Sequence, residues 1–131
     1  MKMFGIVLLV ASSLAAASPE VKWEHSLDAA MTRAKAEHKV IFVDLWTGWC
    51  GWCIKLQKET FPSEEAKAAL GKVVAVSLKT QEADGKPTAF ASLEKTYKVD
   101  GYPTLLILDE KGREIAHNSP LTAPIELRSE R

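Results

Sequence analysis

Apolar residues follow helical spacing in some segments of this chain and form compact runs in others. Ser26 can cap a first helix, which we expect to end near His38. The apolar positions of this helix are Leu27, Ala30, Met31 and Ala34. The run from Val40 to Trp46 is short and rich in β-branched and aromatic residues, with Asp44 as its one charged residue. Such a run is typical of a central strand covered on both faces.

Helical and strand-like segments then alternate up to residue 116. We expect, in order, a helix from Cys50 or Gly51 to about Thr60, a short helix capped by Ser63 and stopped at Gly71, a strand over 73–78, a polar loop over 79–86, a helix beginning at Pro87 and Thr88, a strand over 105–108, a hairpin turn over 109–112 and a returning strand over 113–116. The order α-β-α-α-β-α-β-β predicts an α/β fold whose mixed central sheet has helices on both faces. After His117 the pattern weakens, and we assign no element there.

The composition indicates one compact domain. The chain has 131 residues and is 47% hydrophobic, which is enough for a single core and too little for two. Lys+Arg and Asp+Glu balance at 17 each. A balanced charge gives no reason to expect nucleic acid or an anionic membrane surface as a partner.

The first 17 residues have the pattern of a secretory signal peptide. Lys2 is followed by an apolar segment and then by small residues that end at Ala17. The segment is shorter than the roughly 20 residues that span a bilayer, so an uncleaved membrane anchor is the weaker alternative. We expect an exported mature domain over 18–131 without a membrane span. Outside the cytosol a dithiol normally rests as a disulfide.

Cys50 and Cys53 are the only cysteines, and they directly follow the predicted central strand. A disulfide that closes so short a loop constrains the unfolded chain very little, so fold stabilisation explains this pair poorly. At the start of a helix, the first sulfur faces unpaired N–H groups that stabilise its thiolate. The pair therefore predicts redox chemistry without a bound cofactor. No histidine adjoins it, and two sulfurs fall short of a closed metal site, although a dithiol could carry Cu(I).

Three segments carry a resemblance to the thioredoxin family: Val43–Trp46, Trp49–Cys53 and Gly101–Thr104. The resemblance covers about 40–116. Residues 49–53, 60–61 and 108–114 make it greatest to exported members, especially the C-terminal domain of the transmembrane reductant carrier DsbD. It implies a thioredoxin-like fold in which Pro103 is cis and packs against the cysteine pair. It also implies that the backbone of Tyr102 is open to an extended substrate.

The resemblance also implies a role for each reactive residue. Cys50 is expected to be the more exposed sulfur and the nucleophile, and Cys53 the resolving thiol. Asp44 matches the family's buried aspartate, and burial would raise its pKa toward neutrality, which suits a proton acceptor. The alternative is a solvated, inert Asp44 at a strand edge. The lysine that accompanies this aspartate in thioredoxin has no clear counterpart in residues 73–76.

The expected substrate-binding residues surround the cysteines: Trp49, Gly51, Trp52, Tyr102 and Pro103. Trp49 and Trp52 could form an apolar platform for a docking partner. Core packing is an equal alternative for Trp49, whereas Trp52, set between the cysteines, is expected to be exposed.

The chain is accordingly predicted to be an exported thiol-disulfide oxidoreductase that acts on protein thiols and disulfides in a bacterial periplasm. The resemblance to DsbD favours a reductase that receives electrons from a membrane donor. Two alternatives stay open: a Cu(I) metallochaperone or assembly factor, and a thioredoxin-like adaptor whose cysteines are inactive.

Overall fold

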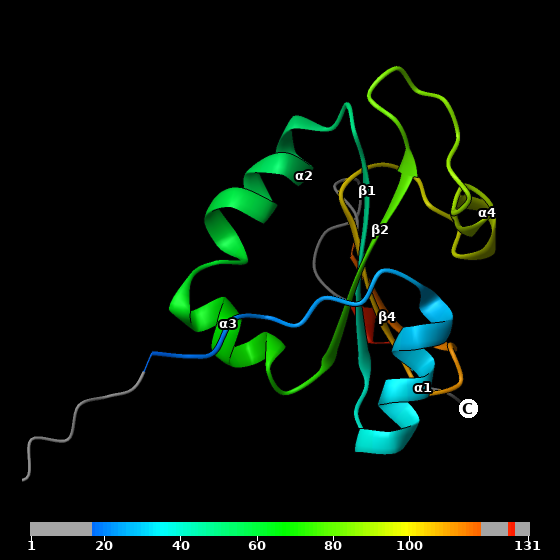
Figure 1. Ribbon diagram of the computed structural model, residues 1–131. Helices are drawn as coiled ribbons and strands as arrows, with labels where there is room; N and C mark the ends of the chain where they lie inside the picture. The colour runs from blue at the N-terminus through cyan, green and yellow to red at the C-terminus, as the bar shows by residue number, and fades with distance from the viewer. Residues whose placement is uncertain (1–16, 119–125, 128–131) are drawn as a thin grey trace, which may run out of the picture.

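A computed structural model describes residues 17–118 and 126–127 of the chain (Figure 1). The predicted signal peptide, except for Ala17, lies outside these residues. The described part forms a five-stranded sheet of order β2-β1-β3-β4-β5. Its strands are β1 (Ile41–Thr47), β2 (Val74–Gln81), β3 (Thr104–Leu108), β4 (Glu114–Asn118) and β5 (Glu126–Leu127).

The mixed sheet predicted from the sequence is confirmed. β1 lies in the interior of the sheet, parallel to β2 and antiparallel to β3, and β3 continues through a hairpin into the antiparallel β4. The hairpin turns at Gly112, whose positive φ of 80° suits a residue without a side chain. Asp109 holds the turn, because its carboxylate accepts hydrogen bonds from the backbone N–H groups of Lys111 and Arg113.

The helices cover both faces of the sheet, as predicted. They are α1 (Leu27–Glu37), α2 (Gly51–Lys55), which continues as the π-helical turn η1 (Leu56–Thr60), α3 (Glu64–Leu70) and α4 (Leu93–Thr96). Figure 1 shows α2 and α3 on one side of the sheet and α1 and α4 on the other. Ser26 and Ser63 cap α1 and α3 by accepting backbone hydrogen bonds, and His38, whose φ is 53°, is the C-cap that follows α1.

The two faces of the sheet carry separate cores. On the side of α1, aliphatic residues of β1, β2 and β3 pack against Ala30 and Ala34. On the opposite side, Trp23, Phe42 and Phe61 form an aromatic cluster whose ring centroids lie 5.2–6.4 Å apart. Trp23 precedes the first predicted element. Its segment is held by the adjacent Glu24, which exchanges backbone hydrogen bonds with β2.

Three predicted elements differ from the structure. A loop was expected from residue 79, but β2 continues to Gln81. The strand persists because burial alternates along it: Thr80 is buried, and the polar side chains on either side of it are only partly covered. The helix expected from Pro87 is reduced to α4: Pro87 instead forms a bridge with Gln81, and turns follow it. Phe90, Leu93 and Tyr97 nevertheless pack on the core, as their spacing predicted. Residues 126–127, where no element was assigned, pair with β4.

Candidate active site

The two cysteines lie where the chain leaves β1 and enters α2. They form a disulfide with a Cα–Cα distance of 5.3 Å. Cys50 occupies the N-cap position, and its Sγ accepts a hydrogen bond from the backbone N–H of Cys53 at 3.1 Å. Cys50 is 5% exposed and Cys53 1%, so the order of exposure is the predicted one although both are buried. The N–H group that stabilises a sulfur at this helix start is therefore already aimed at Cys50.

The peptide bond between Tyr102 and Pro103 is cis, as the family resemblance implied. This bond directly precedes β3, whose first residue, Thr104, pairs with Leu45 of β1. β1 ends two residues after Leu45. The register of the two strands thus brings the proline loop to the end of the sheet at which the dithiol turn begins.

Two tryptophans flank the disulfide, and both are exposed. Trp49 is 51% exposed and Trp52 69%, so the core-packing alternative for Trp49 is wrong. The indole Nε1–H of Trp49 donates a hydrogen bond to Oε1 of Gln81 at 2.9 Å, and its ring meets Tyr102 edge-on. Lys55 Nζ lies 5.1 Å from the ring centroid of Trp52. An apolar surface is therefore present beside the sulfurs.

Asp44 is buried in the middle of β1, and the alternative of a solvated strand edge is wrong. The residue is 1% exposed. Burial raises the pKa of Asp44 to about 6, and hydrogen bonds from Gln57 and Ser77 offset only part of this effect. Ser77 is also its register partner on β2, so the position opposite Asp44 carries a hydroxyl and not a lysine, in agreement with the sequence. The atom Oδ1 has no hydrogen-bond partner within the described part of the chain.

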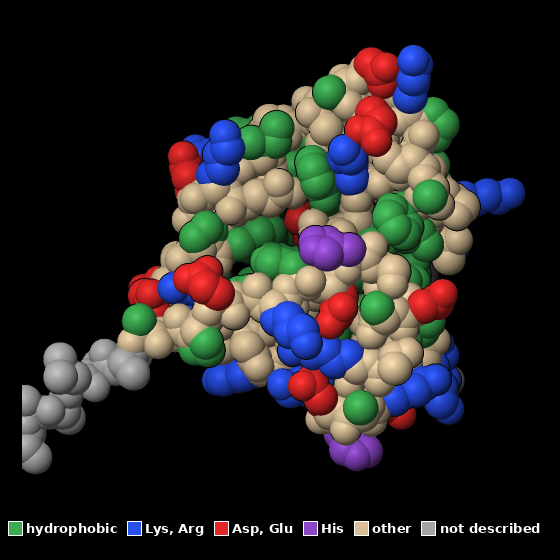
Figure 2. All heavy atoms as spheres, in the orientation of Figure 1, with side chains coloured by type: hydrophobic (Ala, Val, Ile, Leu, Met, Phe, Trp, Pro, Cys, Tyr) green, Lys and Arg blue, Asp and Glu red, His purple; other side chains and the backbone are tan. Residues whose placement is uncertain are grey.

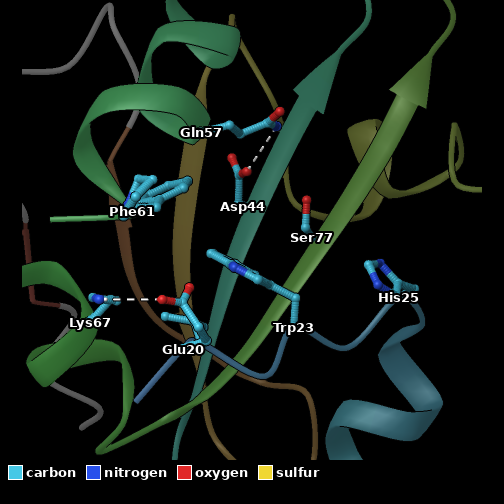
Figure 3. A pocket seen from close by; sticks show the side chains of 10 residues that line it. Glu20, Trp23, His25, Asp44, Gln57, Phe61, Lys67 and Ser77 are labelled. Carbon is cyan, nitrogen blue, oxygen red and sulfur yellow. Dashed lines mark hydrogen bonds and ion pairs between the residues drawn. The ribbon is translucent and has the colours of Figure 1, made fainter. Parts of the chain in front are cut away.

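A pocket of about 460 Å³ opens beside Asp44 on the face that carries α2 and α3. Figure 2 shows the hollow with hydrophobic side chains in its walls. Figure 3 shows Asp44 at its inner end, with Gln57 above it and Trp23 crossing in front of β1 and β2. Glu20 of the N-terminal segment pairs with Lys67 of α3 at 3.4 Å on the opposite side of the pocket. The pocket joins a buried carboxylate to solvent.

Sequence reasoning did not identify Gln57. It is four residues after Cys53, and this spacing places two residues on the same face of a helix. That signal could have indicated a polar side chain on the helix face that carries Cys53. The pocket itself could not be inferred, because it depends on the pairing of the N-terminal segment with β2.

Neither a metal cluster nor a membrane span is found in the described part of the chain. Within 17–118 and 126–127, no three His, Cys, Asp or Glu side chains come together as a metal site. None of the helices described in these ranges combines the length and the apolar character needed to cross a membrane.

The family model of the thioredoxin-like domain matches residues 27–124, so the chain belongs to the thioredoxin-like family. It is 33% identical over 107 residues to the disulfide bond reductase DsbH of Chlamydia pneumoniae, a match that covers 76% of this chain and 63% of DsbH. It is 30% identical over 86 residues to the thiol:disulfide interchange protein DsbD of Pseudoalteromonas atlantica, which is 66% of this chain and 14% of DsbD. The predicted resemblance to DsbD is confirmed, and the matches span less than two thirds of either relative.

Solved structures agree with this family. A DsbH oxidoreductase superposes with a TM-score of 0.67 at 26% sequence identity, over 83% of this chain and 78% of that one. A thioredoxin from Thermus thermophilus superposes with a TM-score of 0.59 at 18% identity, over 85% and 74% of the two chains, and shows the fold alone.

Proposed function

We propose that this chain is an exported thiol-disulfide oxidoreductase that reduces protein disulfides through Cys50 and Cys53. The observation that carries the proposal is the geometry of the disulfide. Cys50 caps α2 with its sulfur in contact with a helical N–H group, and the cis Tyr102–Pro103 bond lies at the same end of the sheet. The relative named disulfide bond reductase, DsbH, supports the direction of electron flow.

The reaction requires only the two sulfurs and the substrate disulfide. In the reduced protein, the Cys50 thiolate attacks one substrate sulfur, forms a mixed disulfide and releases the other substrate sulfur as a thiolate. The Cys53 thiolate then attacks the Cys50 sulfur and releases the second substrate thiol. The substrate gains two electrons, and Cys50 and Cys53 end in the disulfide that the structure contains. A donor dithiol restores the reduced state.

Asp44 serves in this scheme as the acceptor of the Cys53 thiol proton. A carboxylate whose pKa is about 6 is mostly ionised at neutral pH and still holds a proton well enough to return it. Its Oδ1 has no partner among the described residues, and the pocket beside it gives the proton a path to solvent.

The substrate is proposed to dock over the sulfurs, against Trp49, Gly51 and Trp52 on one side and Tyr102 and Pro103 on the other. The exposed tryptophan rings offer apolar contact, and the residue before a cis proline offers backbone groups to an extended chain. The electron donor is proposed to be a membrane protein and the compartment a bacterial periplasm, as expected for a relative of DsbD-type proteins.

Redox titration of the Cys50–Cys53 pair against glutathione tests the direction of transfer. A reduction potential near the roughly −270 mV of thioredoxin is expected, whereas a value near about −120 mV would make the protein an oxidant. Reduction of insulin by the reduced protein tests the activity itself. An inactive wild-type protein would overturn the proposal, and Cys50→Ser serves as the inactive reference.

A further inference from the structure

Gln81, the last residue of β2, connects the dithiol turn to α4. Its Oε1 accepts a hydrogen bond from Nε1–H of Trp49 at 2.9 Å, and its Nε2 donates to both carboxylate oxygens of Glu94, at 3.1 and 3.2 Å. The backbone also takes part, since the N–H of Gly48 donates to the carbonyl oxygen of Gln81 at 2.9 Å. Trp49 is therefore held by the end of β2, one residue before the nucleophilic cysteine.

The orientation of the Gln81 amide follows from the chemistry of its neighbours. An indole N–H can only donate, so the oxygen of the amide must face Trp49. An ionised carboxylate can only accept, so the nitrogen must face Glu94. The result is a chain of two hydrogen bonds, indole to amide to carboxylate, whose second bond is assisted by the charge of Glu94.

Thr80, the neighbouring residue of β2, holds the other aromatic side chain of the site. Its Oγ1 lies 2.6 Å from the hydroxyl of Tyr102, in a hydrogen bond. The rings of Trp49 and Tyr102 meet edge-on, at 5.9 Å between centroids and an angle of 85°. The end of β2 thus fixes one aromatic ring beside the disulfide and another beside the cis proline.

We infer that Gln81 and Glu94 are positioning residues that act through Trp49. They hold the indole so that its exposed face forms a fixed wall for an extended polypeptide carrying an apolar or aromatic side chain next to its cysteine. An exposed tryptophan without such an anchor would lose rotamer freedom on binding, and this loss weakens association. The inference rests on the proposed function, because it concerns the docking of the substrate of that reaction.

The fixed indole face of Trp49 contributes to the binding of a protein substrate and not to the reaction of a small disulfide. A small disulfide needs only the Cys50 sulfur and makes little contact with the indole. The two positioning residues therefore favour protein disulfides over small ones, and they leave the chemistry of the sulfurs unchanged.

An exchange of the two side chains tests the inference. Gln81→Glu places a carboxylate against Glu94, and the repulsion breaks the chain. The double variant Gln81→Glu/Glu94→Gln restores it with only the second bond reversed, because the carboxylate introduced at position 81 would accept from both the indole and the amide introduced at position 94. Gln81→Leu removes the chain without adding charge. Glu82→Gln, next to Gln81 in sequence, serves as a control for a change of charge that leaves both hydrogen bonds of Gln81 intact.

The measurements are KM and kcat for insulin, the rate with glutathione disulfide, and the NMR resonance of the Trp49 indole N–H. Loss of one such hydrogen bond is expected to raise KM for insulin about fivefold in Gln81→Glu and Gln81→Leu. The glutathione disulfide rate should stay unchanged, and the indole resonance should shift. The double variant should return KM and the resonance toward the wild-type values, while Glu82→Gln matches wild type throughout.

An unchanged KM in both single variants, or a double variant no better than Gln81→Glu, would overturn the inference. Equal losses with insulin and glutathione disulfide would also overturn it, because they would indicate a general structural role. Wild-type protein that reduces neither substrate would refute the proposed function, and this inference with it. Trp49→Phe provides an independent check, since it keeps an aromatic ring and removes the N–H donor, and should reproduce the effect of Gln81→Leu.

Discussion

Gln57 approaches Asp44 with a neutral amide: its Nε2 donates to Oδ2 of the carboxylate at 3.5 Å, and Oδ1 has no partner among the described residues. A neutral donor at this distance stabilises an ionised carboxylate less than a cation would. Burial therefore dominates, and the pKa of Asp44 rises to about 6. The protein thus keeps a carboxylate whose ionised form is unfavourable for folding at neutral pH.

Asp44→Asn should stabilise the oxidised protein at pH 8 and not at pH 3.5. The folded-state pKa of about 6 lies above the ordinary value of 3.8, so the folded protein holds this proton more tightly than the unfolded chain. The contribution of Asp44 to the free energy of unfolding therefore falls as pH rises from about 4 to 6, and it stays low above 7. The upper bound of the gain is roughly 3 kcal/mol. Urea denaturation at both pH values measures it, with the exposed Asp100→Asn as the control. A destabilised Asp44→Asn protein at pH 8 would contradict the burial argument.

The resolution step should depend on the ionisation of the same carboxylate. If Asp44 accepts the proton of Cys53, the release of substrate from the mixed disulfide slows as pH falls through about 6. In Asp44→Asn this inflection should be absent, and the rate at pH 7.5 should fall about 10²-fold or more. Single-turnover kinetics from pH 5 to 8 provides the measurement. An inflection near pH 6 that persists in Asp44→Asn would assign it to another group.

The sequence predicts the parts of this site that depend on local patterns. The strand around Asp44 is apolar over most of its length, which identifies a covered central strand, and Ser26 marks the start of α1 directly. The end of β2 is not predicted because its last residues, through Gln81, are mostly polar and are typical of a loop. Gln81 is in a strand conformation because it pairs with Pro87, which is a tertiary contact. Trp23 was missed for the same reason, since nothing in its neighbourhood along the chain indicates that its segment joins β2. Two long-range pairings therefore determine what the sequence does not predict: Glu24 with β2 forms the pocket, and Gln81 with Pro87 positions the residue that holds Trp49.

The two sulfurs should differ in their ability to trap a substrate. Cys53→Ser leaves the Cys50 thiol without a resolving partner, so mixed disulfides with protein substrates should accumulate on Cys50. Cys50→Ser should trap none, because Cys53 is 1% exposed. Non-reducing electrophoresis and mass spectrometry after incubation with oxidised substrate reveal the adducts, and the double serine variant provides the background. Equal trapping by the two single variants would reverse or remove the assigned order.

Two glycines near the disulfide should respond to alanine in opposite directions. A Cβ on Gly48 would lie 2.6 Å from the backbone nitrogen of Ala83, and rotation of a side chain cannot relieve a clash with backbone. Gly48→Ala should therefore destabilise the protein by about 1–3 kcal/mol. A Cβ on Gly51 would meet no atom within 4 Å, and the residue is the first of α2, so Gly51→Ala should stabilise the protein by about 0.4–1 kcal/mol.

Thermal and urea unfolding of the oxidised proteins, measured side by side, distinguish the two cases. Because both substitutions add one methyl group within two residues of Cys50, a difference in sign cannot come from added bulk near the disulfide alone. It requires that the turn at Gly48 packs directly on the loop that follows β2, as the contact with Ala83 indicates. A Gly48→Ala protein as stable as Gly51→Ala would mean that this loop does not lie against the dithiol turn in solution, and the anchoring of Trp49 by Gln81 would then lose its structural basis.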